Sequence, residues 1–407
     1  MIKYRAFVLL AALLSVPAAF AQQTDPLKPA AAAPVLLSRS AVLMDAATGT
    51  LLFSHNPSER IPPASLTKLM TIHLALKEIE AGRAGAGEIV PLPPESWAEN
   101  QSAHSSLMFL GRGQRVTLGE LLLGMAVSSG NDAAVAAALR FAPSIEAFAS
   151  LMNAEAGALG LSATYFVEPA GISGLNQTSA ADFARFCRYY LQRHPQSTVT
   201  LHSVRQFAYP QAANTPASAP RTILQYSHNP LLGVVEGVDG LKTGHINEAG
   251  YNIALTAKRG ASRFIAVLLG ARTEDDRDAD AKNLLEWGFA NYQTLDLGKY
   301  NIDDYLSAQR VWKSREKFVP LTVTGGMLVT IATSRGGVLE WEAEPKNSVE
   351  APVKALAPAG SLVVRDRYGE LVRLPLAFKS DAARGGVFRV LFDGIALFFR
   401  KLFGRAG

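Results

Sequence analysis

Cysteine and charge are both scarce in this sequence. Its 407 residues include one cysteine, Cys187, so no disulfide bond can form within the chain. Charged residues make up 18% of the sequence, and the formal net charge is only +5. This small positive excess gives no reason to expect a nucleic-acid partner. Apolar residues, at 48%, are plentiful enough for a large core, and the length favours more than one domain.

The N-terminus also lacks an apolar run long enough to span a bilayer. Lys3 and Arg5 precede the uncharged stretch AFVLLAALLSV, and Ala19 and Ala21 occupy the small-residue positions of a cleavage site. This pattern predicts a secretory signal peptide over residues 1–21, and therefore a secreted protein.

Apolar periodicity in the next part of the chain predicts a mixed fold of helices and strands. Residues 41–56 alternate around a central Ala-Thr-Gly, as in a β-hairpin, and residues 62–82 form a helical pattern that Gly82 is expected to end. The same signals predict further helices over 118–127, 132–142, 179–194 and 279–292, and strands over 237–245, 249–259 and 262–272. We therefore predict an α+β domain over residues 38–296, after a Pro/Ala-rich linker over residues 22–37.

The rest of the chain has a different character. Residues 297–378 hold short β-rich segments, among them MLVTIAT and SLVVRD, which are broken by glycine and proline. This pattern predicts a small, separate all-β domain. Within the first domain, the stretch YPQAANTPASAPR at 209–221 is predicted to be a loop or an insertion.

A serine and a lysine stand three residues apart in the stretch PPASLTKLMT. On a helix, Ser65 and Lys68 would share one face. A serine hydroxyl becomes a nucleophile when a base takes its proton, and a lysine is such a base only if burial keeps it neutral near pH 7. This spacing alone is common by chance, and the plain alternative is a helix start with a solvated lysine.

Two further motifs follow in a fixed order. Ser129-Gly130-Asn131 lies in the break between two predicted helices, and Lys242-Thr243-Gly244, followed by His245, lies on a predicted strand. Each motif is weak by itself. The ordered triple, with each member on the element that its role requires, indicates a serine acyl-transfer enzyme.

With these motifs the chain resembles the low-molecular-mass penicillin-binding proteins, the serine D-alanyl-D-alanine carboxypeptidases of the penicillin-binding protein 5/6 type. The resemblance extends to the flanking stretches PASLTKLMT, SSLMFL, SSGNDA, VDGLKTGH with AGYN, and LLEWGF. It implies a transpeptidase-like catalytic domain, in which an antiparallel sheet carries helices and a helical subdomain. It also implies a role in peptidoglycan maturation and cell shape, with stem peptides as substrates and β-lactams as covalent inhibitors.

The resemblance implies a catalytic role for three positions, Ser65, Lys68 and Ser129. Ser65 would attack the carbonyl carbon between the two terminal D-alanines, and Lys68 would take its proton. Ser129 would relay a proton to the leaving amine. The backbone N–H groups of Ser65 and His245 would hold the oxyanion. No metal or other cofactor is expected.

Six positions are expected to bind substrate on the same grounds, among them His245 through the backbone N–H named above. Asn131 would bind the substrate amide and Lys68, while Lys242, Thr243 and Arg263 would meet the substrate carboxylate. Gly244 is expected to let the substrate backbone approach the strand.

One loop departs from the family pattern and leaves the choice of substrate bond open. Carboxypeptidases of this type carry an H-G-L stretch after the S-x-N helix, but here the segment is FVEPAGISGLNQTS, with Ala170 at the histidine position. It is closer to the related D,D-endopeptidases, which cut peptide cross-links. Glu168 lies where a class A β-lactamase would place its deacylating glutamate, which is a further alternative. A non-catalytic wall-binding scaffold is the remaining one.

Other polar residues have plainer interpretations. His73 is expected in the core, His104 on a solvated loop or the cleft rim, and Asp132 at a helix start. The acidic run at 274–280 is expected to be a solvated helix start. Cys187 is expected to be a core residue.

The C-terminal stretch is predicted to be an amphipathic helix over residues 384–404. Arg389, Asp393 and Arg400 would form a narrow charged stripe, and aromatic and aliphatic residues would cover the rest. A helix of this kind lies in a membrane interface. We therefore expect a periplasmic protein attached to the outer face of the cytoplasmic membrane. The alternative is a helix docked on the β-domain.

Overall fold

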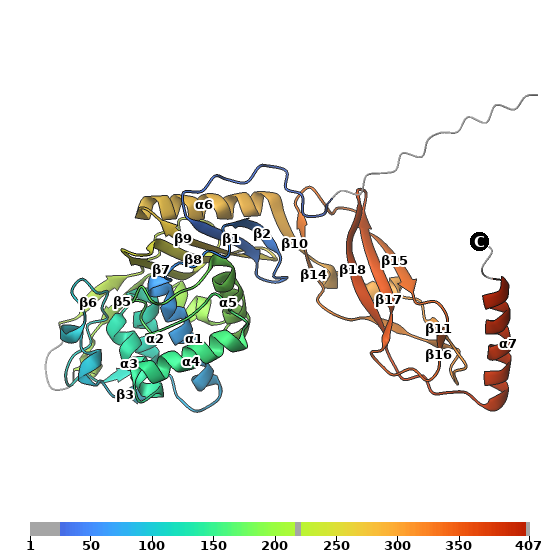
Figure 1. The fold of residues 1–407 in the computed structure, drawn as a ribbon, viewed down its shortest axis with the longest axis horizontal. Helices are drawn as coiled ribbons and strands as arrows, with labels where there is room; N and C mark the ends of the chain where they lie inside the picture. Colours follow the sequence, from blue (N-terminus) through green and yellow to red (C-terminus); the bar gives the residue numbers. More distant parts are fainter. Residues whose placement is uncertain (1–24, 216–220, 404–407) are drawn as a thin grey trace, which may run out of the picture. The chain divides into compact units, whose positions relative to one another are not determined.

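The computed structural model describes residues 25–215 and 221–403, which form two units (Figure 1). The first unit comprises residues 27–304 and 325–334, and the second comprises residues 305–324 together with residues from 335 onwards. The predicted signal peptide at 1–21 and residues 216–220 of the predicted loop lie outside the described residues.

A five-stranded sheet is the centre of the first unit. Its order is β2 (Leu51–His55), β1 (Ser40–Asp45), β9 (Ser262–Ala271), β8 (Gly250–Arg259) and β7 (Val238–Ile246), and every neighbouring pair is antiparallel. β9 is buried almost along its whole length, which explains its nearly unbroken apolar sequence FIAVLLGA. Strand β7, which carries the Lys-Thr-Gly motif, is at one edge.

Helices cover both faces of this sheet. Helix α6 (Glu274–Asn291) packs on one face with Leu284 and Leu285 against Phe264. On the other face, α1 (Lys68–Glu80) and α5 (Ala180–Arg193) belong to a second core, which continues into α2 (Leu118–Val127), α3 (Asn131–Phe141) and α4 (Ile145–Ala158). The predicted α+β architecture is therefore confirmed, and Cys187 is buried in this core.

Local signals place several boundaries where the sequence predicted them. Thr117 and Glu120 form a reciprocal capping box at the start of α2, with Glu120 N donating to Thr117 Oγ1 at 3.2 Å and Thr117 N donating to Glu120 Oε2 at 2.7 Å. Gly82 follows α1 at a φ of +69°, a conformation that glycine adopts without strain. The 209–221 stretch lies between β5 (Gln206–Tyr209) and β6 (Ile223–Tyr226), which pair as a hairpin. Two short strands, β3 (Ile89–Val90) and β4 (Val116–Thr117), pair beside α2.

Three sequence-based boundaries were wrong. Residues 27–37 are not a free linker, because Ala31 N and Leu37 N donate to Asn291 and Asp280 of α6. Helix α6 begins at Glu274, so the acidic run forms its first two turns. The segment MLVTIAT provides β14 (Leu328–Ala332), which pairs with β10 (Tyr292–Asp296) in the first unit.

The second unit is built of β-strands and one helix. Its larger sheet has the order β13 (Leu321–Val323), β18 (Gly369–Phe378), β17 (Pro358–Asp366) and β15 (Glu340–Pro345). A smaller one joins β12 (Phe318–Val319), β11 (Gln309–Trp312) and β16 (Val349–Glu350), and the chain ends in α7 (Val387–Phe403).

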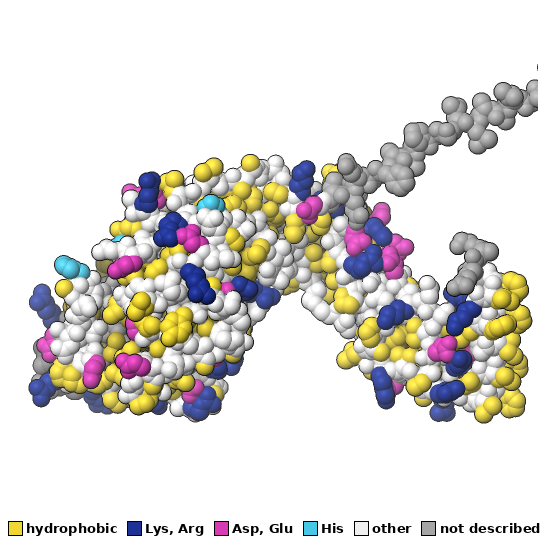
Figure 2. All heavy atoms as spheres, in the orientation of Figure 1, with side chains coloured by type: hydrophobic (Ala, Val, Ile, Leu, Met, Phe, Trp, Pro, Cys, Tyr) yellow, Lys and Arg dark blue, Asp and Glu magenta, His cyan; other side chains and the backbone are white. Residues whose placement is uncertain are grey.

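Helix α7 contacts the strands of its own unit through its charged stripe. Asp393 is buried, accepts a hydrogen bond from Lys313 N at 2.7 Å and pairs with Arg310 at 3.3 Å. The apolar side of the helix stays exposed, with Phe388 at 78% and Phe392 at 68% exposure (Figure 2). The helix is therefore docked on its own unit around Asp393, as in the alternative that the sequence left open, while its wide apolar face stays uncovered.

Among the described helices, no single one is long and apolar enough to cross a membrane, while the bent pair of α3 and α4 meets that test by length and composition only.

Candidate active site

Ser65 lies in a 3-10 turn (Ala64–Thr67) that leads into α1. Two glycines pack closely against this turn. If each carried a side chain, the Cβ atom at Gly171 would lie 1.8 Å from Ala64 O, and the one at Gly244 would lie 2.8 Å from Ser65 N. The turn that carries the serine is thus close enough to require glycine at both positions. The expectation that Gly244 also lets the substrate backbone approach the strand stays a prediction.

The amine of Lys68 is fully buried and contacts three oxygens. It lies 2.9 Å from Ser65 Oγ, 2.7 Å from Asn131 Oδ1 and 2.6 Å from the carbonyl oxygen of Ala170. Burial lowers the pKa of Lys68 to about 7, against the opposing charges of Glu168 and Asp132, which raise it. The amine can therefore lose its proton near neutral pH.

The three contacts also orient the N–H bonds and the lone pair of the Lys68 amine. An ammonium group has three N–H donors, and each faces one of the three oxygens. When the amine loses a proton, Asn131 and Ala170 accept from the two N–H bonds that remain. The lone pair then points at Ser65 Oγ, which is the orientation that a general base needs.

Ser129 and Asn131 lie in the predicted break between α2 and α3. Ser129 has a φ of +56°, in the left-handed region, and Asn131 opens α3. Asp132 is buried and accepts from Met108 N at 2.8 Å and Leu110 N at 2.9 Å, so it ties the neighbouring loop to this break. Its role is that of a loop clamp as well as a helix-start residue.

Lys242 is the second buried amine of the site. Burial, then the charges of Lys68 and Arg277, holds its pKa well below the ordinary value of a lysine. Its Nζ donates to Thr243 O at 2.9 Å, and Thr243 Oγ1 donates to the carbonyl oxygen of His228 at 3.3 Å.

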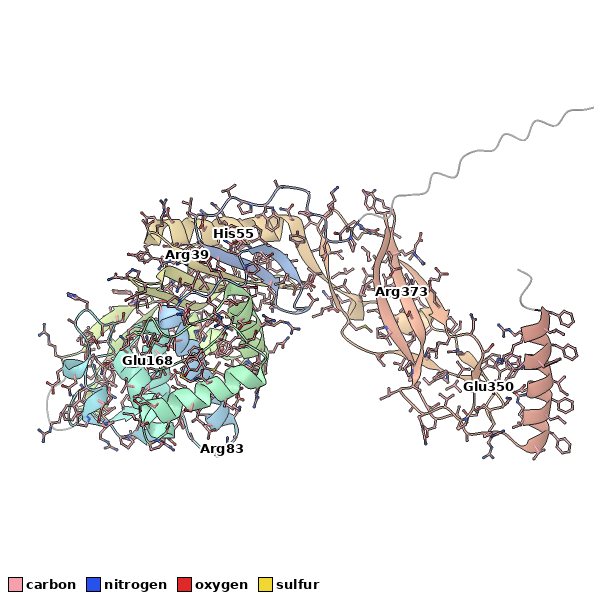
Figure 3. All side chains as sticks on the ribbon, in the orientation of Figure 1. Arg39, His55, Arg83, Glu168, Glu350 and Arg373 are labelled. Carbon is pink, nitrogen blue, oxygen red and sulfur yellow. The ribbon has the colours of Figure 1, made fainter. Side chains whose placement is uncertain are left out.

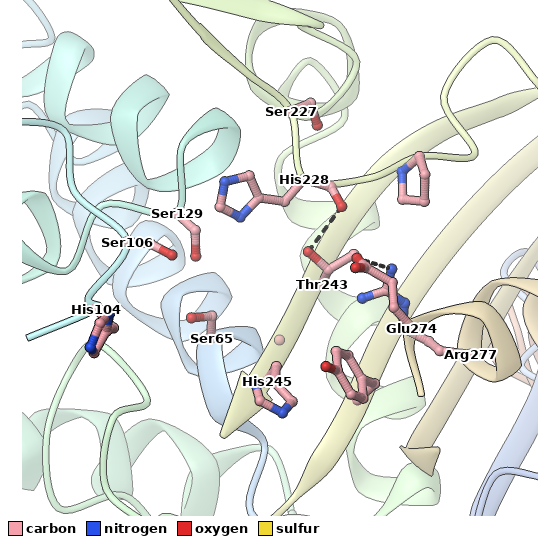
Figure 4. Close-up of a pocket in the computed structure, with 13 residues that line it drawn as sticks. Ser65, His104, Ser106, Ser129, Ser227, His228, Thr243, His245, Glu274 and Arg277 are labelled. Atoms are coloured by element: carbon pink, nitrogen blue, oxygen red, sulfur yellow. Dashed lines mark hydrogen bonds and ion pairs between the residues drawn. The ribbon is translucent and has the colours of Figure 1, made fainter. Parts of the chain in front are cut away.

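A cleft of about 560 Å³ opens above these amines (Figure 4). Ser65, Ser129, Thr243, Gly244 and His245 all line it. The structure thus brings together the three motifs that are 64 and 113 residues apart in the sequence, with Lys68, Asn131 and Lys242 buried behind the lining.

Arg263 is not part of this cleft. Its guanidinium makes two hydrogen bonds to Asp239, at 2.8 and 2.7 Å, and one to Thr256 Oγ1 at 2.9 Å. It lies opposite Lys258 on β8, near the end of the sheet away from His245, whose partner on β8 is Tyr251. The prediction that Arg263 meets the substrate carboxylate was therefore wrong.

Arg277 is the arginine that lines the cleft. It comes from the acidic run, is 2% exposed, and is held by Glu274 at 2.8 Å and Asp278 at 2.7 Å. The sequence signal was an arginine flanked by acidic residues on a helix start. It was missed because the whole run was interpreted as solvated.

The histidines divide between the core and the cleft. His73 is buried, with His194 at 2.7 Å from its Nδ1 and Glu155 at 3.0 Å from its Nε2, as expected of a core residue. His104 lines the cleft rim. His228 was not predicted; it faces the cleft, and burial with the charges of Lys242 and Lys68 lowers its pKa to about 4.

The loop of residues 165–178 contributes backbone to the site. Ala170 provides its carbonyl oxygen to Lys68, as described above, while Glu168 accepts from Ala170 N at 2.6 Å and Gly171 N at 2.7 Å. Both carboxylate oxygens of Glu168 are thus occupied by its own loop. This arrangement does not favour the class A β-lactamase alternative, which needs a glutamate free to activate water.

The side chains of the described residues form no metal site. Within the described ranges, no group of three or more histidine, cysteine, aspartate or glutamate residues is arranged to hold a metal ion.

Comparison with known proteins agrees with this geometry. A family profile described as "D-alanyl-D-alanine carboxypeptidase" matches residues 28–273. The chain is 31% identical over 352 residues to the D-alanyl-D-alanine carboxypeptidase DacF of Bacillus subtilis, with 86% of this chain and 87% of that one covered. It is 29% identical to the D-alanyl-D-alanine endopeptidase of Pseudomonas aeruginosa, but over only 62% of this chain and 77% of that one.

A solved structure extends the likeness over both units. The structure of penicillin binding protein 5 from Haemophilus influenzae matches with a TM-score of 0.75 and 29% identity, covering 87% of this chain and all of that one.

Proposed function

The chain belongs to the D-alanyl-D-alanine carboxypeptidase family, and we propose that it removes the terminal D-alanine of peptidoglycan stem peptides through an acyl-enzyme on Ser65. The observation that carries this proposal is the contact of Lys68 with Ser65, Asn131 and Ala170, which prepares a neutral amine to take the serine proton. The enzyme is a serine hydrolase, and β-lactams, which mimic the scissile amide, acylate the same oxygen.

In the acylation step, Lys68 takes the proton of Ser65 while Oγ attacks the carbonyl carbon. The negative charge that forms on the carbonyl oxygen is stabilised by the backbone N–H groups of Ser65 and His245. The nitrogen of the leaving D-alanine must gain a proton as its bond breaks. Ser129, which lines the cleft with Ser65, relays to this nitrogen the proton that Lys68 took from Ser65. Water then hydrolyses the acyl-enzyme and frees Ser65.

The substrate's terminal carboxylate is recognised by cations and a hydroxyl. Thr243 and Arg277 line the cleft, and Lys242 lies behind Thr243. Arg277 takes the role that the sequence assigned to Arg263. A buried guanidinium beside a cleft is suited to two parallel hydrogen bonds to a carboxylate.

Cutting of peptide cross-links is the second candidate activity. It is favoured by the loop of residues 165–178, in which Ala170 replaces the family's histidine and presents only its carbonyl oxygen to the site. A free terminal carboxylate has a cationic receptor in Arg277, which favours the carboxypeptidase.

One experiment separates the two activities. The purified protein is incubated with a muropeptide mixture and the products are analysed by mass spectrometry. Loss of one D-alanine from pentapeptides supports the proposal, whereas conversion of cross-linked dimers to monomers supports the endopeptidase.

We propose further that the protein is periplasmic and attached to a membrane surface by α7. Nine large apolar side chains of this helix are exposed: Val387, Phe388, Leu391, Phe392, Ile395, Phe398, Phe399, Leu402 and Phe403. Basic residues Arg400 and Lys401 lie in its last turn, where they would meet anionic headgroups. The predicted signal peptide supports placement on the outer face of the cytoplasmic membrane.

A further inference from the structure

We propose that Glu168 is a positioning residue for the catalytic amine, because it fixes the carbonyl group of Ala170 that orients Lys68. This inference rests on the proposed function, in which Lys68 is the general base. Glu168 lies in the loop beside α1 (Figure 3) and does not line the cleft around Ser65.

The first step is the geometry of the loop. Glu168 Oε2 accepts from Ala170 N at 2.6 Å, and Oε1 accepts from Gly171 N at 2.7 Å and from Asn176 Nδ2 at 2.8 Å. The carboxylate thus holds both peptide groups that flank Ala170. Since a peptide group is planar, fixing these two N–H groups fixes the direction of the carbonyl between them.

The second step is what that carbonyl does. Ala170 O is one of the two acceptors that hold the N–H bonds of neutral Lys68 and leave its lone pair facing Ser65 Oγ. The other acceptor, Asn131, is fixed at the start of α3 by regular structure. Ala170 lies in an irregular loop, so its direction depends on Glu168.

The third step concerns charge. Four titratable groups interact with Lys68 through their charges: Glu168 from its loop, Asp132 from α3, Lys242 from β7 and His228 from the segment after β6. Glu168 and Asp132 stabilise the ammonium form, so they raise the pKa of Lys68 against the larger effect of burial. Removing the charge of Glu168 therefore lowers that pKa further.

The two effects give Glu168→Gln a distinctive pH profile. The rate of Ser65 acylation rises with pH as Lys68 becomes neutral, with a midpoint near 7 in the unmodified protein. In the variant this midpoint moves to lower pH, because a nearby opposite charge has been lost. The plateau at high pH falls on the order of 10-fold, because the lone pair is less well aimed.

The experiment measures the acylation rate by a fluorescent penicillin across the pH range, on full-length protein. Glu248→Gln is the matched control, since Glu248 is an exposed carboxylate beside the same loop, where its Cγ would lie 3.5 Å from a Cβ atom added at Gly174. It should leave both the midpoint and the plateau unchanged. Thermal unfolding of each variant reports whether it is folded.

Glu168→Asp provides a second, independent reading if Glu168→Gln fails to fold. It keeps the charge but shortens the reach, so the plateau should fall while the midpoint stays. An unchanged plateau in Glu168→Gln or in Glu168→Asp would overturn the proposal, because the direction of the lone pair would then not depend on this carboxylate. Failure of the unmodified protein to form a penicillin adduct at Ser65 would instead overturn the proposed function.

Discussion

The side-chain amide of Asn252 ties strand β8 to the segment that leads into the nucleophile's turn, because its Nδ2 donates to the carbonyl oxygen of Pro62, two residues before that turn begins at Ala64, at 2.9 Å. Asn252 is fully buried, and its Oδ1 accepts from Gly270 N at 2.8 Å. One side chain therefore joins two strands of the sheet to the start of the turn of Ser65.

Replacement of that amide should loosen the turn. We expect Asn252→Ala to slow acylation by penicillin on the order of 10-fold and to lower stability by about 1–3 kcal/mol, because two buried backbone groups lose their partners. Stopped-flow acylation and thermal unfolding measure the two effects. Asn247→Ala, at an exposed position in the neighbouring turn, is the control. Unchanged acylation in Asn252→Ala would show that the turn is fixed without this residue.

The nucleophile is tested by the site of the adduct. We expect penicillin to label the tryptic peptide that contains Ser65, and we expect Ser65→Ala to carry no label, because no other serine in the cleft contacts the amine of Lys68 among the described residues. Mass spectrometry of the digests locates the drug. A label that persists in Ser65→Ala would rule out the acyl-enzyme on Ser65.

The base is tested by pH and by charge. Since burial lowers the pKa of Lys68 to about 7, acylation should rise as the pH increases through about 7 and level off above it. Lys68→Arg should lose about 10²- to 10⁴-fold in rate, because arginine keeps its proton at all accessible pH values. Acylation rates at several pH values measure both. Near-normal activity in Lys68→Arg would exclude this amine as the base.

The two arginines should separate by their effect on substrate binding. We expect Arg277→Ala to lower kcat/KM for a stem pentapeptide on the order of 10- to 100-fold, mostly through KM, since a charge-assisted hydrogen bond to the carboxylate is lost. Arg263→Ala should reduce thermal stability, because Asp239 loses its partner, with little change in KM. Steady-state kinetics of D-alanine release make the comparison. If Arg263→Ala raises KM more than Arg277→Ala does, Arg263 is the residue that binds the carboxylate, as the sequence predicted.

The helix α7 is tested by removal. Deletion of residues 384–407 should release the protein from anionic vesicles and leave acylation by penicillin unchanged, because the exposed apolar residues are lost and the cleft lies in the other unit. Co-sedimentation with vesicles measures the binding. Continued sedimentation of the truncated protein, or a full-length protein that stays free of the vesicles, would contradict the anchor.

The sequence by itself determined the three motifs, the α+β class and most element boundaries. These depend on local physics: the period of apolar residues, the capping box of Thr117 and Glu120, and glycine at a left-handed position after α1. The pairing of Ser65 with Lys68 is also local, because residues three positions apart lie on the same helical face.

Only the tertiary structure decided which distant groups complete the site. The carbonyl of Ala170 reaches Lys68 across 102 residues of sequence, and backbone oxygens leave no signature in residue identity. The sequence did not show which arginine reaches the cleft. Strand register places Arg263 beside Asp239, whereas the packing of α6 places Arg277 at the cleft. Position 244 is a glycine because the turn that carries Ser65 packs directly against it. Such contacts follow from how the sheet, loop and helices pack together, which no local pattern specifies.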